Sequence, residues 1–216
     1  MNRCAGRIFI KSIRHRGEGV SLQELFKEMI KNEVKPLFSR HGYTKKGLNF
    51  RRVEGGLIYG FNIQKSQGNT ANHVRFYINC MIHSKELAEL QSMVSGGKTM
   101  EEQAHLICRI EEIVPSAPDR YSLTPDTDLV TFSKELLSHL EEAMEYMRNI
   151  TSARDIVEYY MKRTALHLSE ETFHFLLQNG DTTTAQIYLQ QLHAEYGVEN
   201  RWAIFEKKYA AIFAAY

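Results

Sequence analysis

The sequence predicts an α+β fold, in which a small antiparallel β-meander of three to four strands packs against helices and is followed by a C-terminal helical layer. Three observations support this prediction: an amphipathic helix pattern before residue 42, two-residue alternation between residues 47 and 83, and helix patterns with short connections after it. The 216 residues, 43% of them hydrophobic, suffice for a proper core without a metal or disulfide staple.

The first helix pattern spans residues 21–41. Ser21 and Glu24 form an S-x-x-E capping box at its start, and apolar residues follow at helical spacing. Pro36 lies inside the pattern and predicts a kink, because proline removes a helix hydrogen bond. Gly42 is expected to end the helix in the left-handed conformation.

Three strands are predicted next, over Gly47–Val53, Leu57–Ser66 and Val74–His83. The turn residues Glu54-Gly55-Gly56 join the first two strands as a hairpin, and a polar loop joins the second to the third. The connections are short, so the strands form an antiparallel meander.

Alternation assigns the strand side chains to two faces. The apolar face contains Leu48, Phe50, Phe61, Ile63, Phe76, Ile78 and Cys80. The polar face contains Asn49, Arg51, Asn62, Gln64, Arg75, Tyr77 and Asn79. A sheet with one apolar face must cover it, so the helix at 21–41 is expected to pack there.

The rest of the chain reads as mainly helical. Helices are predicted near 85–94, from the Thr99–Glu102 capping box to Val114, over 128–149 and over 152–163, with an edge strand at Arg120–Leu123. Three more helices follow, starting at Ser169, Asp181 and about Glu199. We therefore expect a basic, poorly ordered leader over 1–20, an α+β domain over 21–165 and a helical extension of three helices over 166–216.

Charge is unevenly distributed along the chain. Residues 1–53 contain 13 Lys/Arg and 4 Asp/Glu, whereas residues 54–216 contain 14 Lys/Arg and 22 Asp/Glu. The two parts either complement each other within the fold or attract an external partner such as an acidic protein or nucleic acid.

Cysteine usage indicates a reducing compartment. Cys4, Cys80 and Cys108 are odd in number, widely spaced and lack a CxxC motif, so no disulfide framework is expected. No apolar run approaches the roughly 18 residues of a membrane span. A soluble cytoplasmic protein is the prediction.

Four short stretches resemble a known family. They are His41–Gly47, Phe50–Arg52, Phe61–Ser66 and Phe76–Asn79. In combination they resemble the bacterial family catalogued as domain-of-unknown-function family 4304, and the similarity extends over about residues 21–163. The resemblance implies a short sheet packed on helices and implies no activity.

The polar sheet face is the first candidate binding site. The seven polar-face residues named above comprise four amides, two arginines and a tyrosine. Such groups can bind carboxylates or polar edges of a partner. The alternative is a solvated face, or one that hydrogen-bonds to the later helices.

The sequence leaves two alternative candidate sites. Lys45, Lys46, Arg51 and Arg52 beside aromatic residues suggest a nucleic-acid-binding hairpin, although a charged edge that resists aggregation is the simpler interpretation. An unrecognised hydrolase would place its site on the polar sheet face, around Arg51, Gln64 and Tyr77.

Motifs of catalysis and metal binding are absent from the sequence. It lacks HExxH and GxSxG, and Ser95–Thr99 fails as a phosphate loop because position 92 is Ser92 instead of glycine. No metal, cofactor or catalytic residue is predicted. The resulting hypothesis is a non-enzymatic interaction module, adaptor or immunity-like, that binds another protein through the sheet face or the C-terminal helices.

Overall fold

The computed structural model describes residues 21–94 and 104–216. The predicted leader at 1–20 and the Thr99–Glu102 capping box therefore lie outside the described residues. Chain contacts divide the protein into two compact units. We call the described residues of Met1–Glu54, Ile58–Ile82 and Leu106–Asn149 the sheet unit, and those of Gly55–Leu57, His83–His105 and Ile150–Tyr216 the helical unit. The predicted domain boundary at 165/166 stays a prediction.

The sheet unit confirms the α+β prediction. The described strands are β1 (Thr44–Lys46), β2 (Asn49–Glu54), β3 (Leu57–Lys65), β4 (Val74–Ser84), β5 (Leu106–Arg109) and β6 (Tyr121–Leu123). The sheet order is β1-β2-β3-β4-β5, and β6 pairs with β4 antiparallel, as β5 does. The predicted meander β2-β3-β4 is its centre, and the predicted edge strand at 120–123 is β6. The sheet is larger than the three to four strands expected.

The predicted helix ending at Val114 is wrong over residues 106–112. Leu106–Arg109 forms β5, and a 3-10 turn over Ile110–Glu112 follows it. Cys108 pairs with Cys80 of β4, and both side chains are buried, whereas Ile107 is 54% exposed. This segment has a two-residue period, and its backbone hydrogen bonds are made with β4.

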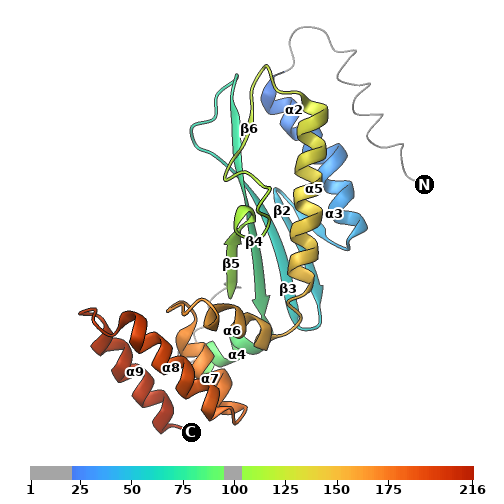
Figure 1. The fold of residues 1–216 in the computed structure, drawn as a ribbon. Coiled ribbons are helices and arrows are strands. Elements are labelled where there is room, and N and C mark those ends of the chain that lie inside the picture. The colour runs from blue at the N-terminus through green and yellow to red at the C-terminus, as the bar shows by residue number, and fades with distance from the viewer. Residues whose placement is uncertain (1–20, 95–103) are drawn as a thin grey trace. The chain divides into compact units, whose positions relative to one another are not determined.

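Helices cover one face of the sheet. The first is α2 (Leu22–Met29), which starts with the predicted capping box at Ser21. It continues as a π-helical turn, η1 (Ile30–Val34), and as α3 (Lys35–Arg40). The irregularity expected at Pro36 is this π-helical turn, which lies just before the proline. Together with α5 (Leu129–Arg148), these helices lie on the same side of the sheet (Figure 1).

Aromatic rings fill the space between the helices and the sheet. Phe38 of α3 stacks on Phe50 of β2 with ring centroids 4.0 Å apart, and it packs against Phe61 of β3 at 5.1 Å. Phe76 of β4 stacks on Tyr121 of β6 at 5.1 Å. All five side chains are at most 5% exposed. The predicted apolar face is therefore the core of the sheet unit.

The helical unit has its own core. It contains α4 (Lys85–Val94), α6 (Ala153–Met161), α7 (Ser169–Gln178), α8 (Thr182–Tyr196) and α9 (Trp202–Ala214). Phe173 packs on Tyr209 and Tyr188, with ring centroids 4.6 and 5.2 Å apart. The hydroxyl of Tyr209 lies 2.8 Å from that of Ser169, so its polar tip is satisfied. Within the described chain, no helix combines the length and apolarity that crossing a membrane requires.

Replacement of Phe50 by alanine should destabilise the sheet unit. The change removes a ring that is 1% exposed and stacked on Phe38, and we expect a loss of about 3–5 kcal/mol in the free energy of unfolding. Val53→Ala, on the same strand but 60% exposed, should change it by less than about 0.5 kcal/mol. Urea unfolding of both variants measures the difference, and equal losses would contradict the assigned faces.

Candidate functional site

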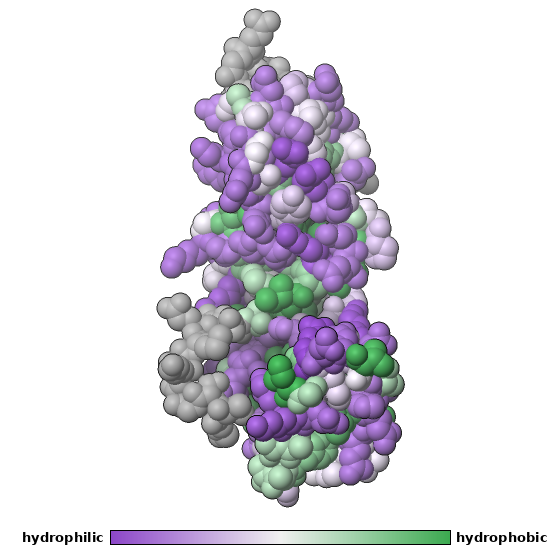
Figure 2. Space-filling view, turned by 90° about the vertical axis from the view of Figure 1, so that its left-hand side faces the viewer, coloured by the Kyte–Doolittle hydropathy of each residue, from purple (hydrophilic) through white to green (hydrophobic). Residues whose placement is uncertain are grey.

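The side of the sheet opposite the aromatic core is the candidate site, and we call it the open face. Residues of β3 and β4 alternate between buried and partly exposed along their length. The structure places all seven predicted polar-face residues here: Asn49, Arg51, Asn62, Gln64, Arg75, Tyr77 and Asn79. Figure 2 views the molecule from this side, and hydrophilic residues predominate over the sheet unit.

An amide ladder crosses the central strands of the open face. The Asn62 amide nitrogen donates to the Asn49 side-chain oxygen at 2.6 Å. The Asn79 amide nitrogen donates to the side-chain oxygens of Asn62 and Gln64, both at 3.1 Å. The ladder connects β2, β3 and β4 and holds the amides in a defined orientation. An ordered polar surface loses less side-chain entropy when it binds a partner.

Arg109 of β5 belongs to the same face. The strand register places it directly opposite Asn79, and its guanidinium carbon lies 4.6 Å from the centroid of the Tyr77 ring. The sequence reasoning missed Arg109 because it assigned this segment to a helix. Leu106, Ile107 and Cys108 form a continuous apolar run, and such a run is compatible with a buried helix as well as with a strand, so the sequence offered no decisive signal.

Arg75 is positioned by the loop between β3 and β4. One of its guanidinium nitrogens donates to the Gly68 carbonyl at 3.3 Å. The backbone nitrogen of Arg75 donates to the Asn69 side chain at 2.7 Å, and the Asn69 amide donates to the Arg75 carbonyl at 3.0 Å. These contacts hold the loop against β4. They also hold the Arg75 guanidinium beside the loop.

The open face is positively charged. The charged strand residues that face this side are Lys46, Arg51, Arg75 and Arg109, and no carboxylate is among the described strand residues of this side. Lys46 belongs here because it pairs with Asn49, and Arg51 pairs with Thr44. Like charges on one surface produce a potential that attracts anions.

The four residues of the predicted nucleic-acid site do not share a surface. Lys46 and Arg51 lie on the open face, whereas Lys45 pairs with Phe50 on the helix-covered side. Arg52 also lies on the covered side, 4.9 Å from the Tyr59 ring centroid, and pairs with Glu54 at 2.5 Å. The hairpin alternates, so adjacent basic residues point in opposite directions.

The helical unit contains a separate apolar groove of about 400 Å³ between α8 and α9. Its lining residues are Leu189, Gln190, His193, Trp202, Glu206, Ala210 and Phe213. The indole nitrogen of Trp202 is buried and has no hydrogen-bond partner among the described residues. This groove is the feature of the C-terminal helices that could contact a partner.

His105 is a buried titratable group of the helical unit. Its Nδ1 accepts a hydrogen bond from the Ser84 backbone nitrogen at 3.0 Å, and the side chain is 2% exposed. Burial lowers the pKa of His105 to about 4, and the neighbouring His83 and His167 add to this effect. Its neutral ring therefore has a structural role at the start of α4. Among residues 21–94 and 104–216, no group of three or more His, Cys, Asp or Glu side chains could hold a metal ion.

Acid should destabilise the protein through His105. The unfolded imidazole has a pKa of about 6.5, whereas the folded pKa is about 4. Between these values the unfolded state binds more protons, so the free energy of unfolding decreases as the pH falls. We expect a smaller decrease in His105→Gln than in the wild type across this interval. Urea unfolding at a series of pH values measures this decrease in both proteins. An equal decrease in the wild type and His105→Gln would refute the lowered pKa of His105.

The amide ladder should contribute to stability through Asn62. Asn62→Ala removes both a donor to Asn49 and an acceptor for Asn79, and we expect a loss of about 1–2 kcal/mol. Gln64→Ala removes one acceptor at an exposed position and should cost less. Thermal unfolding of both variants tests this order, and an unchanged Asn62→Ala protein would show that the ladder contributes nothing.

Comparison with known proteins identifies a family. A family model described as "Domain of unknown function (DUF4304)" matches residues 34–158, which is more than half of the chain. No curated protein and no solved structure gives a significant match. The matched segment includes β1 to β6 and α5, and therefore every strand residue of the open face. The chain belongs to the DUF4304 family, whose domain has no known function.

Proposed function

We propose that the protein is a non-enzymatic binding module that holds an acidic surface of a protein partner against the open face. One observation supports this proposal above the others: the strand side chains of this face include four cations and no carboxylate in the described part of the sheet. A carboxylate-rich partner would complete this arrangement, since electrostatic complementarity selects the partner and speeds its association.

The chemistry of the open face supports binding more than catalysis. A hydrolase would require a nucleophile beside a base, and the contacts of Gln64 and Tyr77 are of another kind. Gln64 accepts from an amide, and Tyr77 lies under the Arg109 guanidinium. Such contacts orient polar groups for recognition, and they activate no nucleophile.

The composition of the face supports a protein partner over nucleic acid. Single-stranded nucleic acid needs exposed rings for stacking, and the Tyr77 ring is already contacted by Arg109. The basic hairpin residues are divided between two sides of the sheet. Exposed Val53 and Ile107 lie on the open side together with the cations, and mixed apolar and charged surface is typical of protein interfaces.

The proposal extends to a cytoplasmic adaptor or immunity-like role. Cys80 and Cys108 lie opposite each other in adjacent strands and are both free thiols. Free thiols in this position fit a reducing compartment. A protein that neutralises or recruits another by covering its acidic surface needs no catalytic group of its own.

Site-specific photo-crosslinking tests the proposed face. A photoreactive amino acid replaces Gln64, which is exposed on the open face, or Lys134, an exposed residue of α5, as the matched control. In cells of the source organism we expect one discrete protein adduct from position 64 and none from 134. Arg51→Glu should abolish this adduct, because it reverses a charge that the acidic partner requires.

Three results would contradict the proposal. Adducts removed by nuclease and not by protease would identify nucleic acid as the ligand. Equal labelling from positions 64 and 134 would show that the open face has no special role. An adduct unaffected by Arg51→Glu would show that the charge of the face does not select its partner.

A further inference from the structure

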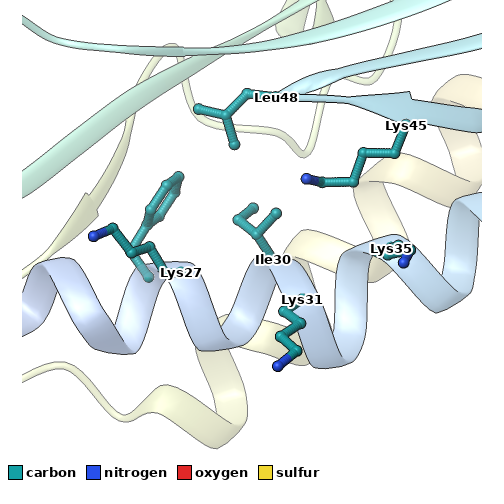
Figure 3. Close-up of a pocket in the computed structure, with 7 residues that line it drawn as sticks. Lys27, Ile30, Lys31, Lys35, Lys45 and Leu48 are labelled. Carbon is teal, nitrogen blue, oxygen red and sulfur yellow. The ribbon is translucent and has the colours of Figure 1, made fainter.

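A pocket lies between the first helical segment and the edge of the sheet, on the side opposite the open face. Its volume is about 340 Å³, which falls in the range of about 300–1,000 Å³ usual for small-molecule sites. The lining consists of three apolar and four basic residues: Phe26, Ile30, Leu48, Lys27, Lys31, Lys35 and Lys45. We call it the lysine pocket (Figure 3).

The floor of the lysine pocket is apolar. Phe26 and Ile30 are at most 3% exposed and belong to the core below the helix. Figure 3 shows Leu48, from the turn between β1 and β2, and Ile30, from the helical segment, pointing toward each other, so the space between them is lined by carbon. Because Phe26 and Ile30 are already buried, an apolar body would gain free energy mainly by covering the half-buried Leu48 and the methylene stems of the exposed lysines.

Lysine ammonium groups surround this apolar floor. Lys45 extends from β1 with its ammonium group toward Ile30, and Lys27 lies at the other end of the space (Figure 3). Lys31 points away from the strands in the same view. Lys27, Lys31 and Lys35 follow each other at intervals of four residues through α2, η1 and α3, so three positive charges lie on one short segment.

These positive charges lack partners in the described part of the protein. Each of the four lysines is exposed, and none forms an ion pair with a described carboxylate. No acidic residue is among the seven that line the pocket. An anion bound there would relieve the repulsion between the lysines, and this gain would add to the burial of its apolar part.

The backbone around the pocket also departs from regular helix. The π-helical turn η1 starts at Ile30, and its residues include Lys31. Such turns are rare and occur frequently at functional sites, because they shift side chains out of the regular helical order. The turn therefore lies where a ligand would contact both the helix and the strand edge.

We infer that the lysine pocket binds a small molecule with one anionic head group, a carboxylate or phosphate, on an apolar body. Lys45 is the main contact for the head group, because the β1–β2 register directs it to the same side as Phe50. A competing explanation is that Lys45 only protects an edge strand, since an inward-pointing charge prevents edge-to-edge pairing. That role needs no ligand, so binding experiments separate the two.

Titration calorimetry with four defined compounds tests the inference. Octanoate and octyl phosphate have both an anionic head and an apolar chain, inorganic phosphate has only the head, and 1-octanol has only the chain. We expect octanoate or octyl phosphate to bind, and the preferred one identifies the head group. Inorganic phosphate and 1-octanol should bind at least tenfold more weakly, roughly 1.4 kcal/mol or more.

Neighbouring lysines of β1 provide the matched variants. Lys45→Gln should weaken binding of the preferred compound about tenfold, whereas Lys45→Arg should retain most of it. Lys46→Gln removes the same charge from the open face of the same strand and should leave binding unchanged. Mass spectrometry of lysine acetylation gives a second readout, in which the compound should protect Lys45 and leave Lys46 reactive.

Several outcomes would overturn the inference. Failure of both octanoate and octyl phosphate to bind wild-type protein would remove the site. Equal binding of 1-octanol would reduce it to an apolar surface, and equal losses in Lys45→Gln and Lys46→Gln would reduce it to net charge. Urea unfolding of each variant confirms that it is folded. The result does not depend on the proposed partner, because that site lies on the other side of the sheet.

Discussion

Packing of aromatic rings between the first helical segment and the sheet is the interaction on which the rest of the sheet unit depends. Phe38 lies against Phe50 and Phe61, so the α3 segment can cover only the side of the sheet that presents these rings. Because successive strand residues point to opposite sides, this choice leaves the amides and guanidiniums on the uncovered side. The open face is therefore a consequence of how the core is filled.

The same alternation divides the basic residues of the first hairpin. Lys46 and Arg51 contribute to the open face, while Lys45 extends over the lysine pocket and Arg52 packs on Tyr59. A cluster that is continuous in sequence thus supplies charge to two separate surfaces. No carboxylate is among the described strand residues of the open face or among the seven residues that line the lysine pocket, so both sets of side chains carry net positive charge.

Polar groups inside the helical unit are arranged for stability. Tyr188 donates to the Ala165 carbonyl at 2.6 Å and Tyr196 to the Thr164 carbonyl at 3.0 Å, which fixes the connection between α6 and α7. Arg154 of α6 donates to Asp181 at 2.9 Å, so a cap residue of α8 is held by a second helix. These bonds satisfy groups that would be costly to leave unpaired. Three buried groups of this unit have no hydrogen-bond partner among the described residues: His105 Nε2, Thr172 Oγ1 and the indole nitrogen of Trp202, which lines the α8–α9 groove.

The sequence by itself determined the elements with local signals. The capping box at Ser21 predicts a helix start, because a cap needs only the next few residues. Two-residue alternation predicts β2 to β4 and assigns the seven polar residues to one face. Tertiary structure alone decided that residues 106–109 are a strand, because β5 takes its hydrogen-bond partners from β4, more than twenty residues earlier. The placement of Arg109 on the open face and the formation of the lysine pocket both depend on contacts between distant segments. No local sequence pattern encodes such contacts.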